Sequence, residues 1–451
     1  MNKLIFSSLV ISSLFLVSLG QQYNCNGQHN VDPPANISNP YVYPANWYPN
    51  DSPPQFASGQ NCAWKFTVPK GMYAYLAVKA NATNAAVLQI TDSTNYVTTI
   101  KTASQEQYFL LDPSFTVSLI SSGVGTMGMT VTWYNVKQVS TTQKVVFANG
   151  SPLALSDTDF ENGVTILADT KVSLLSIPPT NSLTDLSPYM RVTQVYDGPN
   201  INSTLLGNLY QVMNSDMNLV SSGRYLTLYS LVSGYNLGNV AVVQDNSDVQ
   251  QFKAYKAVWC ILLNLCQLSL DASRGPVAAL RYSPLPSYVK GIYFTQTSSL
   301  SVYTDYVDEA HKLVVYTANN SKTNLPQEFR SAFTTFVLDQ GQTLVQLSSN
   351  PADAKWNIPF EGRHGFVASP NFPMDSVMQN FTDQLSGAGT FNISYTVDRV
   401  TYANGAQLQV TIFDGQTAVV DNVYSSSNPP QSTVWSKGDN LLVRFIPNGN
   451  S

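Results

Sequence analysis

Strand patterns run through almost the whole of this sequence after its first twenty residues. Apolar and polar residues alternate, or short β-rich runs end at Gly, Pro, Asn or Asp, and no apolar stripe of helical spacing has a convincing length. The clearest runs are 87–91, 115–120, 226–231, 408–413 and 441–446. Short strands spaced about 8–12 residues apart are typical of sandwiches and barrels. The sequence therefore predicts an all-β fold.

Composition and charge exclude several classes of protein. Apolar residues make up 43% of the chain, enough for buried cores, so intrinsic disorder is disfavoured. Charged residues make up only 11%, and 23 Lys+Arg against 28 Asp+Glu give a net charge of −5. Because the basic residues do not cluster, there is no electrostatic footprint for nucleic acid or an anionic membrane. We expect no nucleic-acid partner.

Residues 1–20 have the pattern of a secretory signal peptide. Lys3 is followed by an apolar run and then by small residues, Ser18 and Gly20, at signal-peptidase spacing. A membrane anchor would need about 20 apolar residues followed by stop-transfer charge, but residues 21–24 are neutral. No later stretch is long enough to span a bilayer. The sequence predicts a secreted, extracellular protein.

Six Asn-X-Ser/Thr sequons agree with that export route. Each is a weak signal alone, but a glycan is large and hydrophilic, so any site that is used must lie on the surface. The predicted glycosylation sites are Asn36, Asn81, Asn202, Asn319, Asn380 and Asn392.

The four cysteines predict disulfides. They form two distant groups, Cys25 with Cys62 and Cys260 with Cys266, and an even number in an oxidising compartment favours pairing. Of the three possible connectivities, pairing within each group costs the least loop-closure entropy. A zinc site would need a second Cys/His pair, and no histidine lies at ligand spacing.

An internal repeat divides the chain into modules. Val195-Tyr-Asp-Gly198 and Ile412-Phe-Asp-Gly415 are each followed by a second glycine turn, 198 to 223 and 415 to 438, which leads into another strand. Glycine supplies the positive φ that such turns need. Weaker copies lie at 88–93 and 300–305. Four copies predict units of about 110 residues, a normal sandwich size.

These modules resemble a known family. Gly365-Phe-Val-Ala-Ser-Pro-Asn-Phe-Pro373 resembles the opening strand of CUB domains, which are two-sheet extracellular sandwiches. Pro44-Ala-Asn-Trp-Tyr-Pro49 and Cys62-Ala-Trp-Lys-Phe-Thr-Val-Pro-Lys-Gly71 resemble the CUB-like domain abundant in secreted nematode proteins. The resemblance implies a Cys25–Cys62 disulfide and a tandem series of antiparallel, jelly-roll type β-sandwiches. The expected order is a signal peptide at 1–20, CUB-like domains at 21–137 and 138–252, a degenerate one at 253–358, and a fourth at 359–451.

Sequence motifs typical of metal-binding or catalytic sites are sparse. Many CUB domains bind Ca²⁺ through Glu and Asp, but here the matching positions lack the carboxylates, and Asp197 and Asp414 are explained as turn residues. The acidic stretch 305–309 is typical of a solvated loop. His-Glu-x-x-His and Gly-x-Ser-x-Gly are absent. We expect no catalytic residue, no metal and no cofactor.

Aromatic residues are the remaining candidates for recognition. Trp47 and Tyr48 lie in a Pro/Asn-rich loop, where they either contact a ligand or cover an edge of the sandwich. The sequence therefore predicts a non-enzymatic recognition or adhesion protein with an extracellular protein or glycan ligand. The resemblance adds a role in innate immune or stress response. The alternatives are a glycan-binding, lectin-like effector and a degenerate secreted hydrolase.

Overall fold

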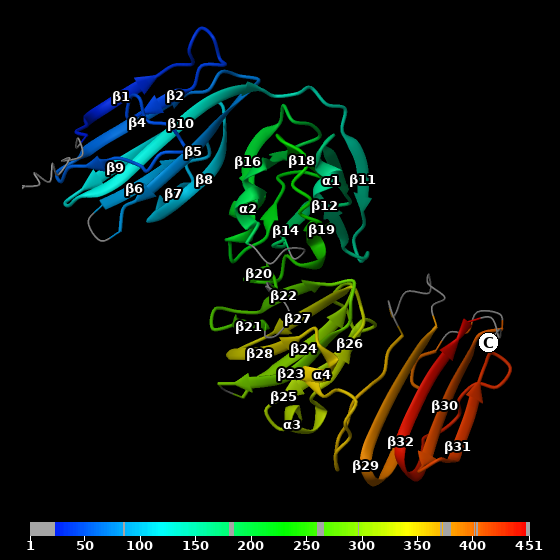
Figure 1. Ribbon diagram of the computed structural model, residues 1–451. Coiled ribbons are helices and arrows are strands. Elements are labelled where there is room, and N and C mark those ends of the chain that lie inside the picture. The colour runs from blue at the N-terminus through cyan, green and yellow to red at the C-terminus, as the bar shows by residue number, and fades with distance from the viewer. Residues whose placement is uncertain are drawn as a thin grey trace, which may run out of the picture. The chain divides into compact units, whose positions relative to one another are not determined.

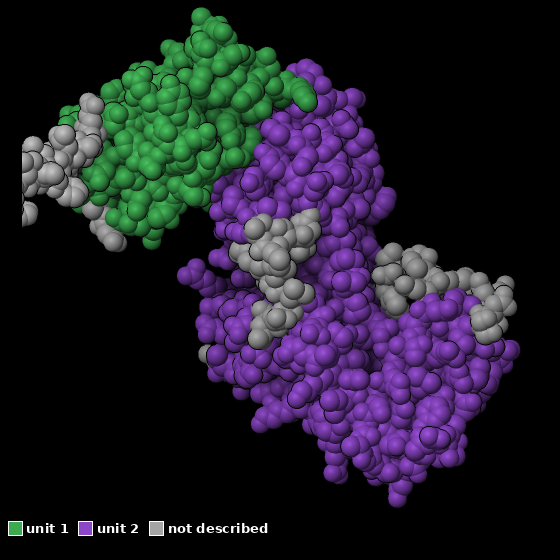
Figure 2. Space-filling model, viewed as in Figure 1, with its two compact units in different colours: residues 1–137 green, residues 138–451 purple. Residues whose placement is uncertain are grey.

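The structure is a computed structural model that describes residues 23–447 except 84–85, 180–184, 259–265, 296, 370–371, 373–379, 401 and 403–404. Strands supply nearly all of its regular structure (Figure 1), which confirms the all-β prediction. The chain divides into two compact units, Met1–Lys137 and Gln138–Ser451 (Figure 2). The predicted signal peptide, residues 1–20, lies outside the described residues.

The first unit is a sandwich of two sheets. One sheet contains, in order, β1 (Asn26–Val31), β4 (Asn61–Thr67), β9 (Ser114–Ser121), β6 (Ala86–Thr91) and β7 (Val97–Ile100). The other contains β2 (Tyr41–Tyr43), β10 (Gly125–Asn135), β5 (Met72–Asn81) and β8 (Thr102–Leu111), and β3 (Gln55–Phe56) also pairs with β10.

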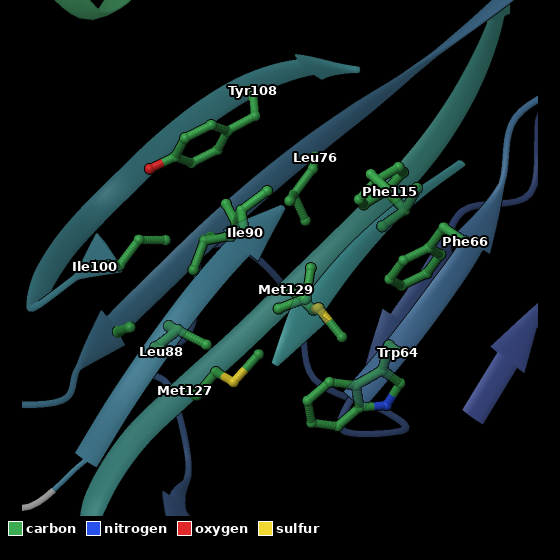
Figure 3. Packing of buried hydrophobic residues seen from close by; sticks show 14 of the residues in the cluster. Trp64, Phe66, Leu76, Leu88, Ile90, Ile100, Tyr108, Phe115, Met127 and Met129 are labelled. Atoms are coloured by element: carbon green, nitrogen blue, oxygen red, sulfur yellow. The ribbon is translucent and has the colours of Figure 1, made fainter. Parts of the chain in front are cut away.

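Alternating side chains of these two sheets form the core of the first unit. On β4, Trp64 and Phe66 are buried while their neighbours point outward, because successive residues of a strand face opposite sides. Phe66 stacks on Phe115 of β9, with 4.7 Å between the ring centroids. Figure 3 shows Met129 of β10, a strand of the opposite sheet, next to these two rings. The alternation of apolar and polar residues along these strands therefore indicates which side chains face the core.

The second sandwich repeats this strand order. One sheet contains β11 (Thr142–Val146), β13 (Val164–Ala168), β18 (Tyr225–Ser230), β15 (Thr193–Asp197) and β16 (Thr204–Asn208). The other contains β12 (Leu153–Ser156), β19 (Asn239–Asp245), β14 (Val172–Ser176) and β17 (Leu219–Val220). Short helical turns occupy its connections: α1 (Asp157–Phe160), η1 (Ser187–Val192), α2 (Leu209–Met213) and η2 (Asn246–Asp248).

Residues 254–348 form a third sandwich with the same order. One sheet contains β20 (Ala254–Ala257), β22 (Val277–Tyr282), β27 (Phe333–Leu338), β24 (Ser299–Thr304) and β25 (Lys312–Thr317). The other contains β21 (Cys266–Asp271), β28 (Gln342–Ser348), β23 (Ser287–Phe294) and β26 (Gln327–Phe329). Two helical turns follow strands, α3 (Ser321–Asn324) and α4 (Pro351–Ala354). In each sandwich the first strand runs parallel to its neighbour, β1 with β4, β11 with β13 and β20 with β22.

The second and third sandwiches share a buried apolar contact. Leu175 of β14 and Val242 of β19 pack in one cluster with Tyr255, Leu280 of β22 and Val337 of β27. Strands at this contact are covered on both faces, so all five residues of β14 are buried. Two of the five buried residues of β14, Ser173 and Ser176, are polar.

The last strands form one four-stranded sheet, ordered β29 (Phe381–Tyr395), β32 (Val434–Ile446), β30 (Gln407–Asp414) and β31 (Thr417–Tyr424). The antiparallel pair of its two longest strands, β29 and β32, is sharply bent. The pairing of β29 with β32 shifts register between Ser386 and Phe391. Tyr424 lies at the end of the sheet where β29 begins, yet its hydroxyl is 2.9 Å from that of Tyr395, at the end of β29. The second half of this strand pair must therefore fold back over the first.

We call this second half, 391–395 with 434–438, the distal ribbon. On its inner face, Tyr395 packs against a small apolar cluster of Leu408, Val410 and Tyr424. In the described part of 359–451 the second layer is thus this ribbon and not a separate sheet. A fourth CUB-like sandwich stays a prediction.

The strand predictions and one motif have different outcomes. All five predicted runs overlap strands, namely β6, β9, β18, β30 and β32. The segment at 365–373, interpreted as an opening strand, contains no strand in its described part and lies against the third sandwich. Gln327 of β26 donates to the Phe366 carbonyl at 2.7 Å and accepts from its N–H at 3.1 Å, and Phe366 packs on the third core. That interpretation is wrong, because burying Phe366 there ties the segment to the preceding sandwich.

Candidate functional site

A disulfide fixes the first strand of the molecule. Cys25 and Cys62 are bonded, with 5.7 Å between their Cα atoms, which confirms the predicted pair. Cys25 immediately precedes β1, and Cys62 lies on β4, the strand that runs parallel to it. The Cys25 N–H also donates to the Gln60 side chain. Cys266 is disulfide-bonded as well, but Cys260 lies outside the described residues, so their pairing stays a prediction.

All six sequon asparagines are exposed. At one of them the side chain accepts a 2.8 Å hydrogen bond from the sequon hydroxyl, Asn81 from Thr83. At another it accepts from the backbone N–H two residues on, Asn36 from Ser38. Exposure is a requirement for carrying a glycan, and every predicted site meets it.

The two candidate aromatic residues of the first unit, Trp47 and Tyr48, differ in exposure: one ring is buried and the other is exposed. Trp47 is only 6% exposed, and a Cβ added to Gly128 of β10 would meet its indole at 2.6 Å. Trp47 therefore covers the sheet and offers no free ring face, which corrects its assignment as a ligand contact. Tyr48 is 67% exposed, so any contact from this loop falls to Tyr48.

Sequence reasoning missed the most exposed large apolar residue among those described, Trp435 at 71%. It lies on the outer face of the distal ribbon, directly opposite Ser394, and Asn392 is directly opposite Lys437 on the same face. The alternation Val434-Trp435-Ser436-Lys437 indicates a strand, but it does not say which side is covered. The bend of the β29–β32 strand pair decides that, since it turns Trp435 outward.

The acidic loop after β24 contains paired charges. Asp308 accepts from His311 Nδ1 at 2.5 Å, and Lys312 contacts Glu309 at 2.5 Å. Burial raises the pKa of Asp305 to about 6, opposed by the nearby His311. Within the described ranges, no group of three His, Cys, Asp or Glu side chains could hold a metal ion. Asp197 accepts from the Ser222 N–H at 2.8 Å, in keeping with a role in the turn.

A buried ionic network joins the third sandwich to the last sheet. Arg330 donates to Glu328 of β26 at 2.9 Å and to Asp383 of β29, and Tyr288 donates to Glu328 at 2.9 Å. The side chains of Glu328 and Asp383 are only 6% and 7% exposed. Burial raises the pKa of Asp383 to about 6, Arg330 opposes that rise and Glu328 adds to it. These groups serve the contact between the two parts.

The sequence of the first unit matches a known domain family. Residues 20–137 match the CUB-like domain. CUB-like domains are typically extracellular and are generally binding modules without catalytic activity. Residues 144–231 and 247–350 match two further families, described as domains of unknown function (DUF7592 and DUF7591). Both regions have the strand order of the CUB-like domain before them.

Comparisons of whole chains add little. No curated protein matches the sequence. Among solved structures, the chain is similar to the CUB1-EGF-CUB2 domain of human MASP-1/3, at 12% identity and a TM-score of 0.18, over 46% of this chain and 98% of that one. It is also similar to tripeptidyl peptidase 2, at 9% identity and a TM-score of 0.20, over 93% of this chain and 27% of that one. These superpositions are too loose to transfer any residue or role.

No described helix is long and apolar enough to cross a membrane.

Proposed function

We propose that this chain is a secreted, glycosylated, non-enzymatic recognition or adhesion protein that acts in innate immune or stress response. The CUB-like domain at residues 20–137 is the observation that carries the proposal, since such domains are typically extracellular and bind protein or other ligands. The Cys25–Cys62 disulfide supports an oxidising compartment. The immune or stress role rests on the resemblance to secreted nematode CUB-like proteins.

Expression of the full chain in eukaryotic secretory cells tests the export route. We expect the protein in the medium, starting near Gln21, and we expect an N-glycosidase to lower its mass at several sites. A variant without residues 2–20 is the control and should stay in the cell without glycans. A full-length product that keeps Met1 in the cytosol, or that carries no glycan in the medium, would contradict the proposal.

Glycan binding is the second candidate function, and the exposed Tyr48 favours it. A tyrosine ring offers a large, rigid apolar face for a sugar or protein at a small entropic cost. Tyr48 reaches solvent from a loop whose other ring, Trp47, is anchored against β10.

Tyr48→Ala is expected to weaken binding of the secreted protein to its ligand on a glycan array or cell surface about tenfold or more, as at a contact hot spot. Tyr293→Ala is the matched control, because Tyr293 is also a strongly exposed tyrosine, at 56%, but belongs to β23 of the third sandwich and not to that loop. Equal affinities of the two variants would remove this loop from the recognition surface.

A further inference from the structure

The exposed indole of Trp435 lies beside a predicted glycan attachment site. The outer face of the distal ribbon carries two directly paired rows, Asn392 opposite Lys437 and Ser394 opposite Trp435. All four residues are exposed. Asn392 and Ser394 are the first and third residues of one sequon, so the sequon lies directly across from the indole.

The surroundings of Trp435 leave its ring uncovered by protein. Its neighbours on the same face are small or polar, and Thr396 and Thr433 hydrogen-bond to each other at 2.8 Å. Within the part of the chain that is described, no aromatic side chain packs on the indole. A tryptophan ring exposed to this degree offers a large apolar face for association with other molecules. Its position beside an edge strand, β29, adds to the risk of unwanted association.

We propose that the N-glycan on Asn392 lies over Trp435, with the apolar C–H face of its first sugar rings stacked on the indole. Asn392 is the diagonal neighbour of Trp435, and such neighbours on paired strands are about 7–8 Å apart. A sugar attached to the asparagine amide reaches across that gap. The electron-rich face of an indole attracts polarised C–H groups, and Lys437 can donate to the sugar hydroxyls.

The tethered glycan is the favoured occupant because, once attached to Asn392, it stays next to the ring. A group attached to the neighbouring residue acts at an effective concentration of about mM, which a free sugar outside the cell has to exceed. The glycan would shield the indole and block pairing along the β29 edge. Trp435 then contacts the glycan of its own chain and does not bind the sugars of other molecules.

This inference rests on the proposed glycosylation, and oxidative footprinting of the secreted protein tests it. Peptide mapping measures the occupancy of Asn392 and the rate at which hydroxyl radicals oxidise Trp435. We expect Asn392→Gln to speed the oxidation of Trp435 several-fold. Asn319→Gln, which removes a sequon between β25 and α3, should leave that rate unchanged.

Substitutions of Trp435 and Lys437 test the same contact through its effect on the glycan. Trp435→Ala should release the glycan from the ring and make it more accessible to processing enzymes. Trp435→Phe keeps an aromatic ring and should keep the glycan in place. Lys437→Ala should increase the accessibility of the glycan less than Trp435→Ala does. An occupied Asn392 with an unchanged oxidation rate in Asn392→Gln would overturn the inference, as would an empty Asn392 beside other occupied sequons. A protein without glycans at any sequon would instead overturn the proposed function.

Discussion

Arg330→Met is expected to lower the free energy of unfolding by about 3–5 kcal/mol, because it leaves two buried carboxylates without their cation. Arg330 contacts both Glu328 and Asp383, whose side chains are 6% and 7% exposed. Urea unfolding measures the loss. Hydrogen exchange at β26 and β29 should locate it, since a chain with several sandwiches need not unfold in one step.

The pH dependence of this loss follows from Asp383. Burial, the largest cause, raises its pKa to about 6. The folded state therefore binds this proton more tightly than the unfolded chain, where an aspartate has a pKa of about 3.9. The stabilising contribution of Asp383 is complete below about pH 4 and is lost as the pH rises to about 6. Without Arg330 the ionised form is still less favourable, so the loss should be larger at pH 7 than at pH 4.

Lys290→Met is the matched control for Arg330→Met. Lys290 and Asp353 form a 2.8 Å ion pair, but their side chains are 23% and 35% exposed. Exposed pairs contribute about 0–1 kcal/mol because water screens them. Similar losses in the two variants would show that burial of the Arg330 network does not strengthen it.

Strand positions could be predicted because they depend on neighbours in sequence. The alternation around Trp64 and Phe66 reports the two faces of β4 without any knowledge of what covers them. The contact between the second and third sandwiches could not be predicted in that way. Leu175 and Leu280 lie in the same cluster there, although they are far apart in sequence. An apolar pattern shows that a strand is buried on both faces, but it does not show which other strands cover it.

The candidate sites show the same limit at single residues. Trp47 and Tyr48 are adjacent in one loop, but Gly128 of β10 decides which of them is buried. Trp435 lies in a strand whose pattern suits a core, and the bend between Ser386 and Phe391 turns it outward. Phe366 belongs to a motif that resembles an opening strand, yet the third core binds it. In each case a long-range contact overrides the local signal.

Removing the Cys25–Cys62 disulfide is expected to cost about 4 kcal/mol for its separation of 37 residues, on the chain-entropy account of such crosslinks. The double variant Cys25→Ala/Cys62→Ala tests this without leaving a free thiol from the pair. The loss should be concentrated at β1, because β4 is its one partner among the described strands and its residues are mostly exposed.

Urea unfolding of the first unit and hydrogen exchange at the β1 amides measure the effect of this double variant, and a lower yield in the medium should accompany it. The matched control is Cys260→Ala/Cys266→Ala, whose predicted crosslink closes a much shorter loop and should contribute about 2 kcal/mol. Unchanged protection of β1 in the first variant would mean that pairing with β4 alone holds the strand. The CUB-like domain would then keep its first strand without the crosslink, and the expected drop in secretion should be absent too.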